Sequence, residues 1–354
     1  MTIVRRAMCP QKPLGILRSA LVVLALVLVV PLQARAQTHE IVDATGRTVT
    51  IPDAPTRVFA AGPPAAALLY ALNPDAMIGW VRPPAEADLP YLLPQTHDLP
   101  TLGRLTGRGD TLNLEVLLSA EPELILDFGT VNDTYLDLAA RIQEQTGIPY
   151  VLIDGSFDNT PAALRLLGDI LGVPERAEEL ASYAEETFAM VDSTLEGIPE
   201  ADRPGVYLAR SADGLETAGP NSLNAEIISR VGARNVVEAS NDGLSNISPE
   251  NVLAWAPDVI VTIDAGFAET VGSNPAWADV PAVADGRVYL AARAPFGFID
   301  SPPSVNRLIG LRWAMNTLYL EEANSDLRQD VRDFYTLFYQ VTPDDEALTA
   351  LVGE

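Results

Sequence analysis

The chain has 354 residues, of which 48% are hydrophobic, so it is long enough for two globular domains with cores of their own. Its 23 basic and 48 acidic residues give a net charge of −25, which excludes the broad cationic surface that nucleic-acid binding requires. The single cysteine, Cys9, and the two distant histidines, His39 and His97, exclude a disulfide framework and a multi-histidine zinc site.

The first 36 residues have the pattern of a secretory signal peptide. Residues 1–19 carry four basic side chains and no acidic one, the apolar run 20–32 follows, and Ala34-Arg35-Ala36 comes next. The run is shorter than the roughly 20 residues of a membrane-spanning helix, and no cysteine follows it for lipid attachment. We therefore predict export to the periplasm with cleavage after Ala36, and the choice between Sec and twin-arginine export stays open.

Cleavage would make the chain still more acidic. It removes five of the 23 basic residues and none of the 48 acidic ones, which leaves 18 basic residues and a net charge of −30. No lysine follows Lys12, so every later cation is an arginine. A surface with this charge keeps a protein soluble and unassociated, and we predict a monomer.

The first half of the mature chain alternates strands and helices. Residues 41–51 predict a β-hairpin that turns at Thr45-Gly46-Arg47. Strands are then predicted over residues 57–61, 76–81, 124–128 and 150–153, and helices over residues 64–72, 113–119 and 135–146. This alternation is typical of parallel sheets with helical crossovers.

The second half repeats the alternation. Strands are predicted over residues 205–209, 259–263 and 287–291, and helices over residues 224–231, 249–255 and 275–279, with a last helical region from about residue 302. The predicted fold class is therefore α/β, with two Rossmann-like α/β domains joined by one long α-helix and a ligand cleft between them.

A helical segment separates the two halves. Thr160-Pro161 begins a short helix that Gly172 ends, and Pro174 begins a second helix that reaches about residue 196. At 1.5 Å per residue the second helix is about 35 Å long, enough to cross between two domains. We predict lobes over residues 37–158 and 198–354 with a linking segment over 159–197; the alternative is a crossover helix inside one large domain.

Several stretches resemble one known family. Residues 41–58 follow the pattern D-x-x-G-R-x-V-x-(I/L)-P-x-x-P-x-R-V, and they closely resemble the opening of periplasmic binding proteins that serve ABC importers of iron-siderophores, haem and cobalamin. Further similar stretches lie over residues 68–72, 122–126, 226–237 and 247–261. The resemblance implies the class III arrangement, two α/β lobes and one linking helix, and a receptor that hands a metal complex to a permease and its ATPase without chemistry and without a cofactor or metal site of its own.

Loops at the carboxyl ends of the predicted strands are the expected ligand site, because ligands of parallel sheets bind there. They cover residues 61–64, 80–84, 103–108, 127–130, 210–211, 264–267 and 293–298. Arginine suits carboxylate, phosphate or hydroxamate oxygens, and aromatic side chains pack on a chelator or macrocycle. The candidate ligand-binding residues are Pro63, Trp80, Arg82, Phe128, Arg210, Phe267, Arg293 and Phe296.

Residues 295–313 favour a second ligand class. Asp300 or Ser301 is placed to cap a helix whose first turn contains Pro302 and Pro303, which leaves backbone N–H groups for an anion. The segment resembles a branch of the same family that includes a molybdate and tungstate binder. A siderophore, haem, cobalamin or an oxyanion therefore all remain open as ligands.

The resemblance also implies a docking mode, with one exposed glutamate on each lobe facing the permease. Glu226 stands at the position of the second lobe, whereas Ala67 stands at that of the first, where the neighbouring Asp75 is the available substitute. Because the first glutamate is absent, the sequence does not decide whether the protein docks on its permease at two points.

Two other classes of protein are alternatives, an enzyme and a ligand sensor. The sequence has no G-x-S-x-G, H-E-x-x-H or P-loop motif, and no cysteine after residue 36, so an enzyme is not predicted. A periplasmic ligand sensor with the same fold is the other alternative. Because one packed helix resists hinge motion, we expect only a small closure on the ligand.

Overall fold

In the computed structural model, residue 2 and residues 37–107, 112–238, 243–323 and 325–353 are described. Residues 37–354 form one compact unit. Apart from residue 2, the predicted signal peptide lies outside the described residues. Among the helices of the described ranges, none is long and apolar enough to cross a membrane.

A three-stranded parallel sheet forms the centre of the N-terminal half. Its order is β3 (Val58–Ala60), β4 (Leu124–Gly129) and β5 (Tyr150–Asp154). The connecting helices are α1 (Pro63–Leu72), α2 (Leu114–Ser119) and α3 (Asp133–Thr146). The strands are short apolar runs with almost every residue buried, as parallel strands covered on both faces require.

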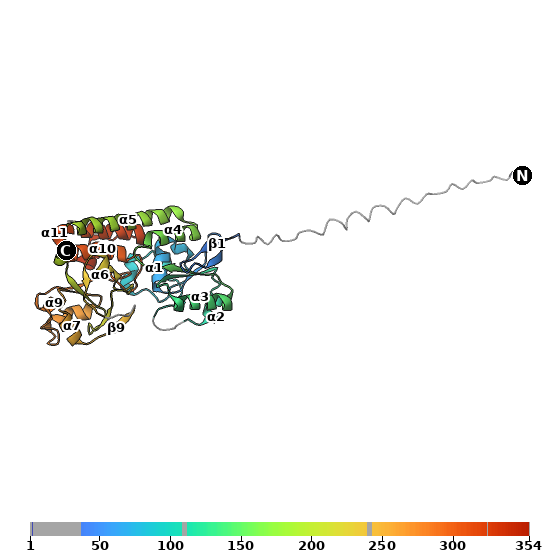
Figure 1. Ribbon diagram of the computed structural model, residues 1–354. Coiled ribbons are helices and arrows are strands. Elements are labelled where there is room, and N and C mark those ends of the chain that lie inside the picture. The colour runs from blue at the N-terminus through green and yellow to red at the C-terminus, as the bar shows by residue number, and fades with distance from the viewer. Residues whose placement is uncertain (1, 3–36, 108–111, 239–242, 324, 354) are drawn as a thin grey trace. The chain divides into compact units, whose positions relative to one another are not determined.

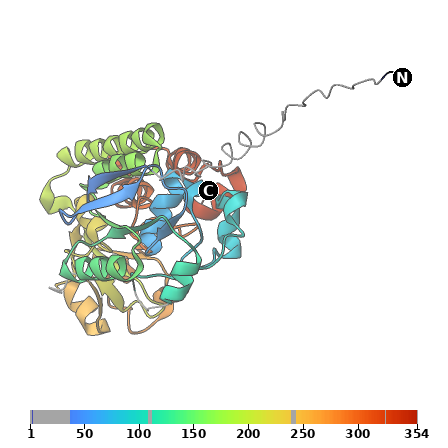
Figure 2. The same cartoon turned by 90° about the vertical axis from the view of Figure 1, so that its right-hand side faces the viewer.

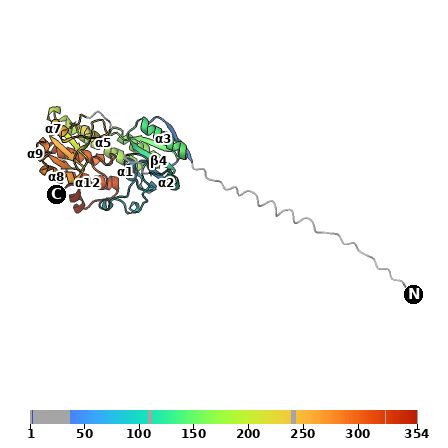
Figure 3. The same ribbon diagram turned by 90° about the horizontal axis from the view of Figure 1, so that it is seen from below.

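The C-terminal half has its own parallel sheet. Its order is β11 (Val288–Leu290), β10 (Val259–Thr262), β6 (Gly205–Ala209) and β8 (Arg234–Asn235). The helices are α6 (Glu226–Arg230), α7 (Pro249–Trp255), α8 (Ala265–Thr270) and α9 (Pro281–Ala284), and β7 (Glu216–Ala218) pairs with β9 (Leu244–Asn246). Helices α7 to α9 and helices α2 and α3 lie at opposite ends of the described unit (Figure 3). The predicted α/β class is confirmed.

Two consecutive helices connect the halves. They are α4 (Thr160–Leu171), which ends at Gly172 in a left-handed conformation, and the 23-residue α5 (Pro174–Glu196). Both follow the proline and glycine signals of the sequence. Helix α5 runs along one side of the unit and packs against α10 (Arg307–Leu318) (Figure 1).

The C-terminal segment packs against both halves. It contains α10, α11 (Leu320–Ala323), α12 (Leu327–Phe334), a π-helical turn (Tyr335–Tyr339) and α13 (Asp345–Val352). The Tyr70 hydroxyl of α1 donates to the Tyr339 carbonyl at 2.9 Å, and the Tyr91 hydroxyl donates to the Ala347 carbonyl at 3.3 Å. One hydrophobic core therefore extends through both halves, so the end of the chain is not confined to the C-terminal lobe.

An N-terminal hairpin is fixed by its turn. It consists of β1 (Thr38–Val42) and β2 (Thr48–Pro52), as predicted. The Asp43 carboxylate accepts hydrogen bonds from the Thr45 amide at 2.9 Å, the Thr45 hydroxyl at 2.6 Å and Arg47 Nη2 at 2.6 Å. Ala44 N–H donates to the Leu152 carbonyl at 2.9 Å, which places the hairpin (blue in Figure 2) beside β5.

Replacing Asp43 with asparagine is expected to lower the free energy of unfolding by about 2 kcal/mol at neutral pH. Burial acts to raise the pKa of Asp43, but the hydrogen bonds from Thr45 and Arg47 and the charge of Arg47 together hold the pKa below its usual value. A lowered folded-state pKa gives stability that is present above the unfolded-state pKa and lost as the pH falls through the folded-state pKa.

Urea unfolding of wild type and Asp43→Asn at pH values from 7 to 3 checks this expectation. The difference between the two proteins should shrink toward the acid end. The control is Asp75→Asn, since Asp75 is an exposed residue of the 3₁₀ turn Pro74–Ala76. A difference that stays constant with pH would contradict the role assigned to the Asp43 charge.

Some predicted elements are wrong. Residues 76–81 form no strand: Ala76 ends a 3₁₀ turn (Pro74–Ala76), and Met77 and Trp80 make only isolated bridges, to Val58 and Thr101. Residues 275–279 are turns, and the last helical region begins at Arg307 rather than near residue 302. Helix α8 and the pair β7 and β9 were not predicted. Other short 3₁₀ turns are Glu86–Tyr91, Pro94–Thr96, Glu200–Asp202 and Val271–Ser273.

Candidate functional site

Two adjoining cavities lie at the carboxyl ends of the sheets. The first, which we call the arginine chamber, has a volume of about 500 Å³ and includes Arg82, Arg104 and Arg210 in its lining. The second, the aromatic chamber, has a volume of about 360 Å³ and includes Trp80, Phe296 and Arg293. Both volumes fall within the range of small-molecule sites. The residues that line both chambers are Pro63, Arg82, Ser301 and Pro302.

A loop over residues 103–107 forms one wall of the arginine chamber. The amides of Leu105 and Thr106 both donate to the Ala61 carbonyl, at 2.7 and 3.0 Å, which holds the loop against the end of β3. Gly62 is required at this contact, because a Cβ atom there would lie 2.5 Å from the Thr106 hydroxyl oxygen. The loop thereby places Arg104 in the chamber wall.

A buried carboxyl group forms the floor beneath that loop. Asp127, at the end of β4, is 4% exposed and accepts hydrogen bonds from the Tyr150 hydroxyl at 2.9 Å and the Thr106 hydroxyl at 3.2 Å. Burial raises the pKa of Asp127, while the bonds from Tyr150 and Thr106 oppose that rise. This carboxyl therefore resists ionisation and contributes less negative charge to the chamber than an exposed aspartate would.

The opposite wall contains an ion-paired cluster from the C-terminal half. Arg210 follows β6, and its Nε lies 2.5 Å from Oδ2 of Asp300, which is fully buried. Asp300 also accepts from Asn224 Nδ2 at 2.8 Å, and Arg210 Nη1 contacts the Glu216 carboxylate. Arg210 is thus held by two carboxylates at the wall of the chamber, and its role in ligand binding stays a prediction.

The lining of the chamber has more arginine than carboxylate side chains, in contrast to the chain as a whole. Its arginines are Arg82, Arg104 and Arg210, of which Arg210 is paired with Asp300 and Glu216, and its carboxyl groups are Asp300 and Asp127, whose pKa burial raises. The side chain of Arg82 is exposed and lies at the junction of the two chambers. Such an arrangement suits an anionic ligand.

The structure brings all but one of the predicted ligand-binding residues to the two chambers. Pro63, Arg82, Phe128 and Arg210 line the arginine chamber, and Trp80, Arg293 and Phe296 line the aromatic one.

Phe267 is the exception: it is 2% exposed and lines neither chamber. Its ring packs edge-on against Trp277 with centroids 4.9 Å apart, so it belongs to the core of the C-terminal half.

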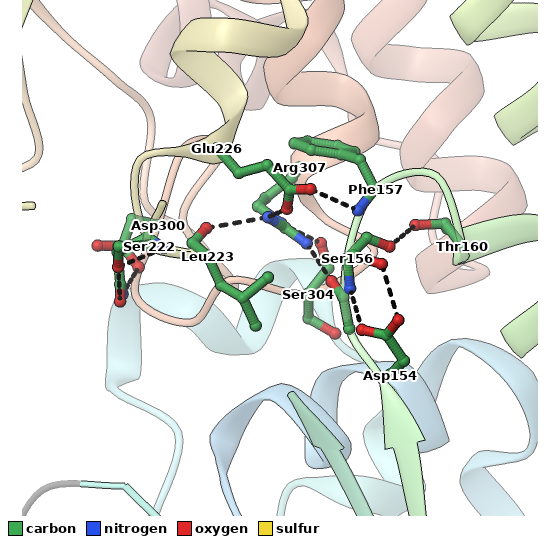
Figure 4. Close-up of polar contacts among 12 residues, drawn as sticks. Asp154, Ser156, Phe157, Thr160, Ser222, Leu223, Glu226, Asp300, Ser304 and Arg307 are labelled. Carbon is green, nitrogen blue, oxygen red and sulfur yellow. Dashed lines mark hydrogen bonds and ion pairs between the residues drawn. The ribbon is translucent and has the colours of Figure 1, made fainter. Parts of the chain in front are cut away.

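Glu226 is not a free docking glutamate. Its carboxylate lies 3.1 Å from Arg307 Nη1 and accepts from the Phe157 amide at 3.1 Å (Figure 4). Ala67 is fully buried in α1, so the position expected for docking on the first lobe is not at the surface either. Asp75 is exposed, and its role in docking stays a prediction.

Several lining residues were not among the candidates. Arg104 and Thr106 lie in the loop over residues 103–107, which was among the loops expected at the site, but neither was chosen as a candidate residue. Tyr135 and Asn224 lie near the starts of helices, where the sequence gives no chemical signal. Within the described ranges, no group of three or more His, Cys, Asp or Glu side chains is placed to hold a metal ion.

A two-lobed α/β unit with an arginine-lined cavity at the strand ends defines a solute-binding protein, and comparisons with known proteins agree. A family model described as periplasmic binding protein matches residues 69–294. The chain belongs to this family, whose members are solute-binding proteins of ABC importers that deliver ligands to permeases. Family and fold are those of transport binding proteins rather than enzymes.

Individual relatives bind different ligands. The molybdate-binding protein MolA of Haemophilus influenzae is 25% identical over 70% of this chain and 77% of its own length. A vitamin B12-binding protein of Pectobacterium carotovorum is 28% identical over 58% of this chain and 71% of its own length. The structure of an ABC transporter solute-binding protein from Sulfurospirillum deleyianum is 29% identical and superposes with a TM-score of 0.79 over 88% of this chain and 98% of that one.

Proposed function

We propose that this protein binds an anionic metal complex, of the ferric-chelate type, and delivers it to an inner-membrane ABC importer from the periplasm. One observation carries the proposal: three arginines, contributed by both halves, surround a cavity of about 500 Å³ in a chain whose net charge is −25. Residues 1–36 act as the signal peptide in this proposal, and the mature protein works as a monomer.

A bare oxyanion such as molybdate is the second candidate ligand. It is favoured by the resemblance to MolA and by the same three guanidinium groups. An anion of four oxygens occupies roughly 100 Å³ if each oxygen takes about the volume of a water molecule. It would fill a small part of the arginine chamber, whereas a chelate would use most of it.

Replacing Arg82 with alanine is expected to weaken the binding of anionic ligands about tenfold or more without lowering the stability of the protein. Its side chain is exposed, so the fold does not depend on it, yet it borders both chambers. Isothermal titration with molybdate, with a ferric tricatecholate and with cobalamin measures the affinities. A thermal-shift screen gives an independent check, since a ligand at 100 times its Kd adds about 2.7 kcal/mol.

The matched control is Arg141→Ala, which removes an exposed arginine of α3 that lines neither chamber. It should bind like wild type. If Arg82→Ala and Arg141→Ala lost the same affinity for anions, the effect would come from the net charge of the protein and not from the position of Arg82. If none of the probes binds to the wild-type protein, the proposed ligand classes fail.

A further inference from the structure

The two carboxyl groups in the lining of the arginine chamber have different partners. Asp300 is fully buried and paired with Arg210, whose Nε lies 2.5 Å from Oδ2 of Asp300. Asp127, at the floor, is 4% exposed, and within the described ranges no cationic side chain is among the groups that lower its pKa. An ionised Asp127 is therefore a buried charge without a cation beside it, which is costly. Of the two carboxyl groups, Asp127 is the one whose charge can change.

The neighbours of Asp127 can hold it in either protonation state. The Thr106 hydroxyl donates to Oδ1 at 3.2 Å, and the Tyr150 hydroxyl donates to Oδ2 at 2.9 Å. A hydroxyl group can also accept a hydrogen bond, so it can turn when a proton arrives on the carboxylate. We expect Oδ1 to take up the proton, because its bond is the longer and weaker of the two. The charge of Asp127 can thus change while the packing of the floor is kept.

Two tyrosines lie close to Asp127, Tyr150 of β5 and Tyr135 of α3, which also lines the chamber. Burial raises the pKa of both tyrosines, and the charge of Asp127 adds to the rise. Both therefore stay neutral near pH 7, so a change of charge at the floor belongs to Asp127. Behind Tyr150, Arg47 Nη2 donates to the Tyr150 carbonyl at 3.2 Å and is paired with Asp43. The other charged groups of the lining are Arg82, Arg104 and the pair of Arg210 and Asp300.

An anion in the chamber shifts the protonation equilibrium of Asp127. A negative charge brought near a carboxyl group favours the protonated form, so the pKa of Asp127 is higher with the anion bound than without it. Burial already raises that pKa in the free protein, while the bonds from Tyr150 and Thr106 oppose the rise. By linkage, the affinity for the anion falls as the pH rises through the interval between the two pKa values, and it is constant above and below this interval.

We propose that Asp127 couples ligand binding to proton uptake: the arginine chamber takes up one anion together with one proton from the solvent, which binds to the Asp127 carboxylate. The proposal rests on the proposed function, since it concerns the same anion in the same chamber. Protonation removes a negative charge from the chamber floor, and the neutral carboxyl group no longer repels the ligand. Asp127 thereby selects for the charge of the ligand, although the ion-paired Asp300 is the more deeply buried carboxyl group.

The test measures affinity and proton uptake together. Isothermal titration with molybdate and with a ferric tricatecholate is carried out at pH values from 6 to 9, in two buffers of different ionisation enthalpy, on wild type, Asp127→Asn and Asp137→Asn. Asp137 is an exposed aspartate of α3 that lines neither chamber, so Asp137→Asn is the control matched in charge. A probe that itself titrates affects all three proteins alike.

We expect Asp127→Asn to bind increasingly more tightly than wild type as the pH rises, by about tenfold at pH 9 for each pKa unit that separates the bound from the free protein. Wild type should take up as much as one proton more than Asp127→Asn within that interval. Asp137→Asn should behave like wild type in both respects. Weaker binding by Asp127→Asn at every pH contradicts the proposal, because its neutral side chain has the charge of the protonated aspartate.

A second variant covers the case in which Asp127→Asn fails to fold. Tyr150→Phe removes a donor that lowers the pKa of Asp127 but keeps the carboxyl group. It should move the fall in affinity to higher pH, a shift that a purely structural role of Tyr150 does not produce. If a probe binds and the tested variant has the pH profile and proton uptake of wild type, the proton coupling is overturned and the proposed function stands. Binding of neither probe to wild type overturns both proposals.

Discussion

Replacing Arg307 with alanine is expected to destabilise the protein by about 3–5 kcal/mol, because the guanidinium is fully buried and bonded to both halves. Its Nη2 donates to the Gly155 carbonyl at 2.7 Å, after β5. Its Nη1 donates to the Leu223 carbonyl, just before α6, at 3.0 Å. The same nitrogen also contacts the carboxylate of Glu226, the first residue of α6. The guanidinium carbon also lies 4.1 Å from the centroid of the Phe157 ring. Its loss removes the guanidinium donor from the Glu226 carboxylate and from three carbonyl groups, those of Gly155, Leu223 and Ser304.

Urea unfolding measures the effect, with Arg234→Ala as the control. Arg234 has a side chain that is 64% exposed and lies 3.9 Å from Asp258, so its loss should cost well under 1 kcal/mol. Combining Arg307→Met with Glu226→Gln should recover part of the loss, because the unpaired carboxylate is then removed as well. A single variant Arg307→Ala as stable as the control would show that the halves are held by apolar packing alone.

Arg307 also bears on how far the halves can move. Together with the C-terminal segment, it joins the N-terminal sheet to the helices of the C-terminal half through hydrogen bonds in which α5 takes no part. A wide hinge opening would break these bonds in the interior, which is costly. The small closure that we expect from a single linking helix therefore has a second physical cause, which the sequence did not indicate.

Local signals predicted most of the regular structure. Helices α4 and α5 follow Thr160-Pro161, Gly172 and Pro174 closely, and the hairpin follows the Asp43 to Arg47 pattern. These predictions are correct because the residue that sets the backbone conformation lies inside the helix or hairpin or next to it. Residues 76–81 failed because an apolar run can be buried by packing without pairing in a sheet, and a one-dimensional pattern does not distinguish the two.

The sequence predicted part of the site, because ligands of parallel sheets bind at the loops that follow the strands, and the strands themselves could be predicted. Phe128 lies near the carboxyl end of β4 and Phe267 lies in α8, which follows β10, yet only Phe128 lines a chamber, because Phe267 packs on Trp277 in the core. Which charged side chains form ion pairs could not be predicted from the sequence. Glu226 meets Arg307 across 81 residues and Arg210 meets Asp300 across 90, so neither pair leaves a local pattern. The resemblance to the family assigned Glu226 to docking, and its bond to Arg307 was not part of that prediction.

Replacing Asp300 with alanine is expected to destabilise the protein by about 3 kcal/mol and to disturb the arginine chamber. Asp300 is fully buried and accepts three bonds, from Arg210 Nε at 2.5 Å, Asn224 Nδ2 at 2.8 Å and the Ser301 amide at 2.6 Å. Without it, Arg210 keeps only Glu216 as its acidic partner, and the segment that separates the two chambers loses its anchor.

Urea unfolding gives the stability of Asp300→Ala, and titration with the anionic probes gives its affinity. The control is Asp279→Ala, an exposed aspartate outside both chambers, whose loss should change stability by no more than about 0.5 kcal/mol. The pairing argument also predicts that Arg210→Met with Asp300→Leu is more stable than Asp300→Ala, since Arg210 and Asp300 are then removed together and Glu216, the other carboxylate partner of Arg210, keeps part of its side chain exposed to solvent. Because the double variant lacks a chamber arginine, its stability should recover while its affinity for anions does not. Recovery of both would mean that Arg210 serves the fold and not the ligand.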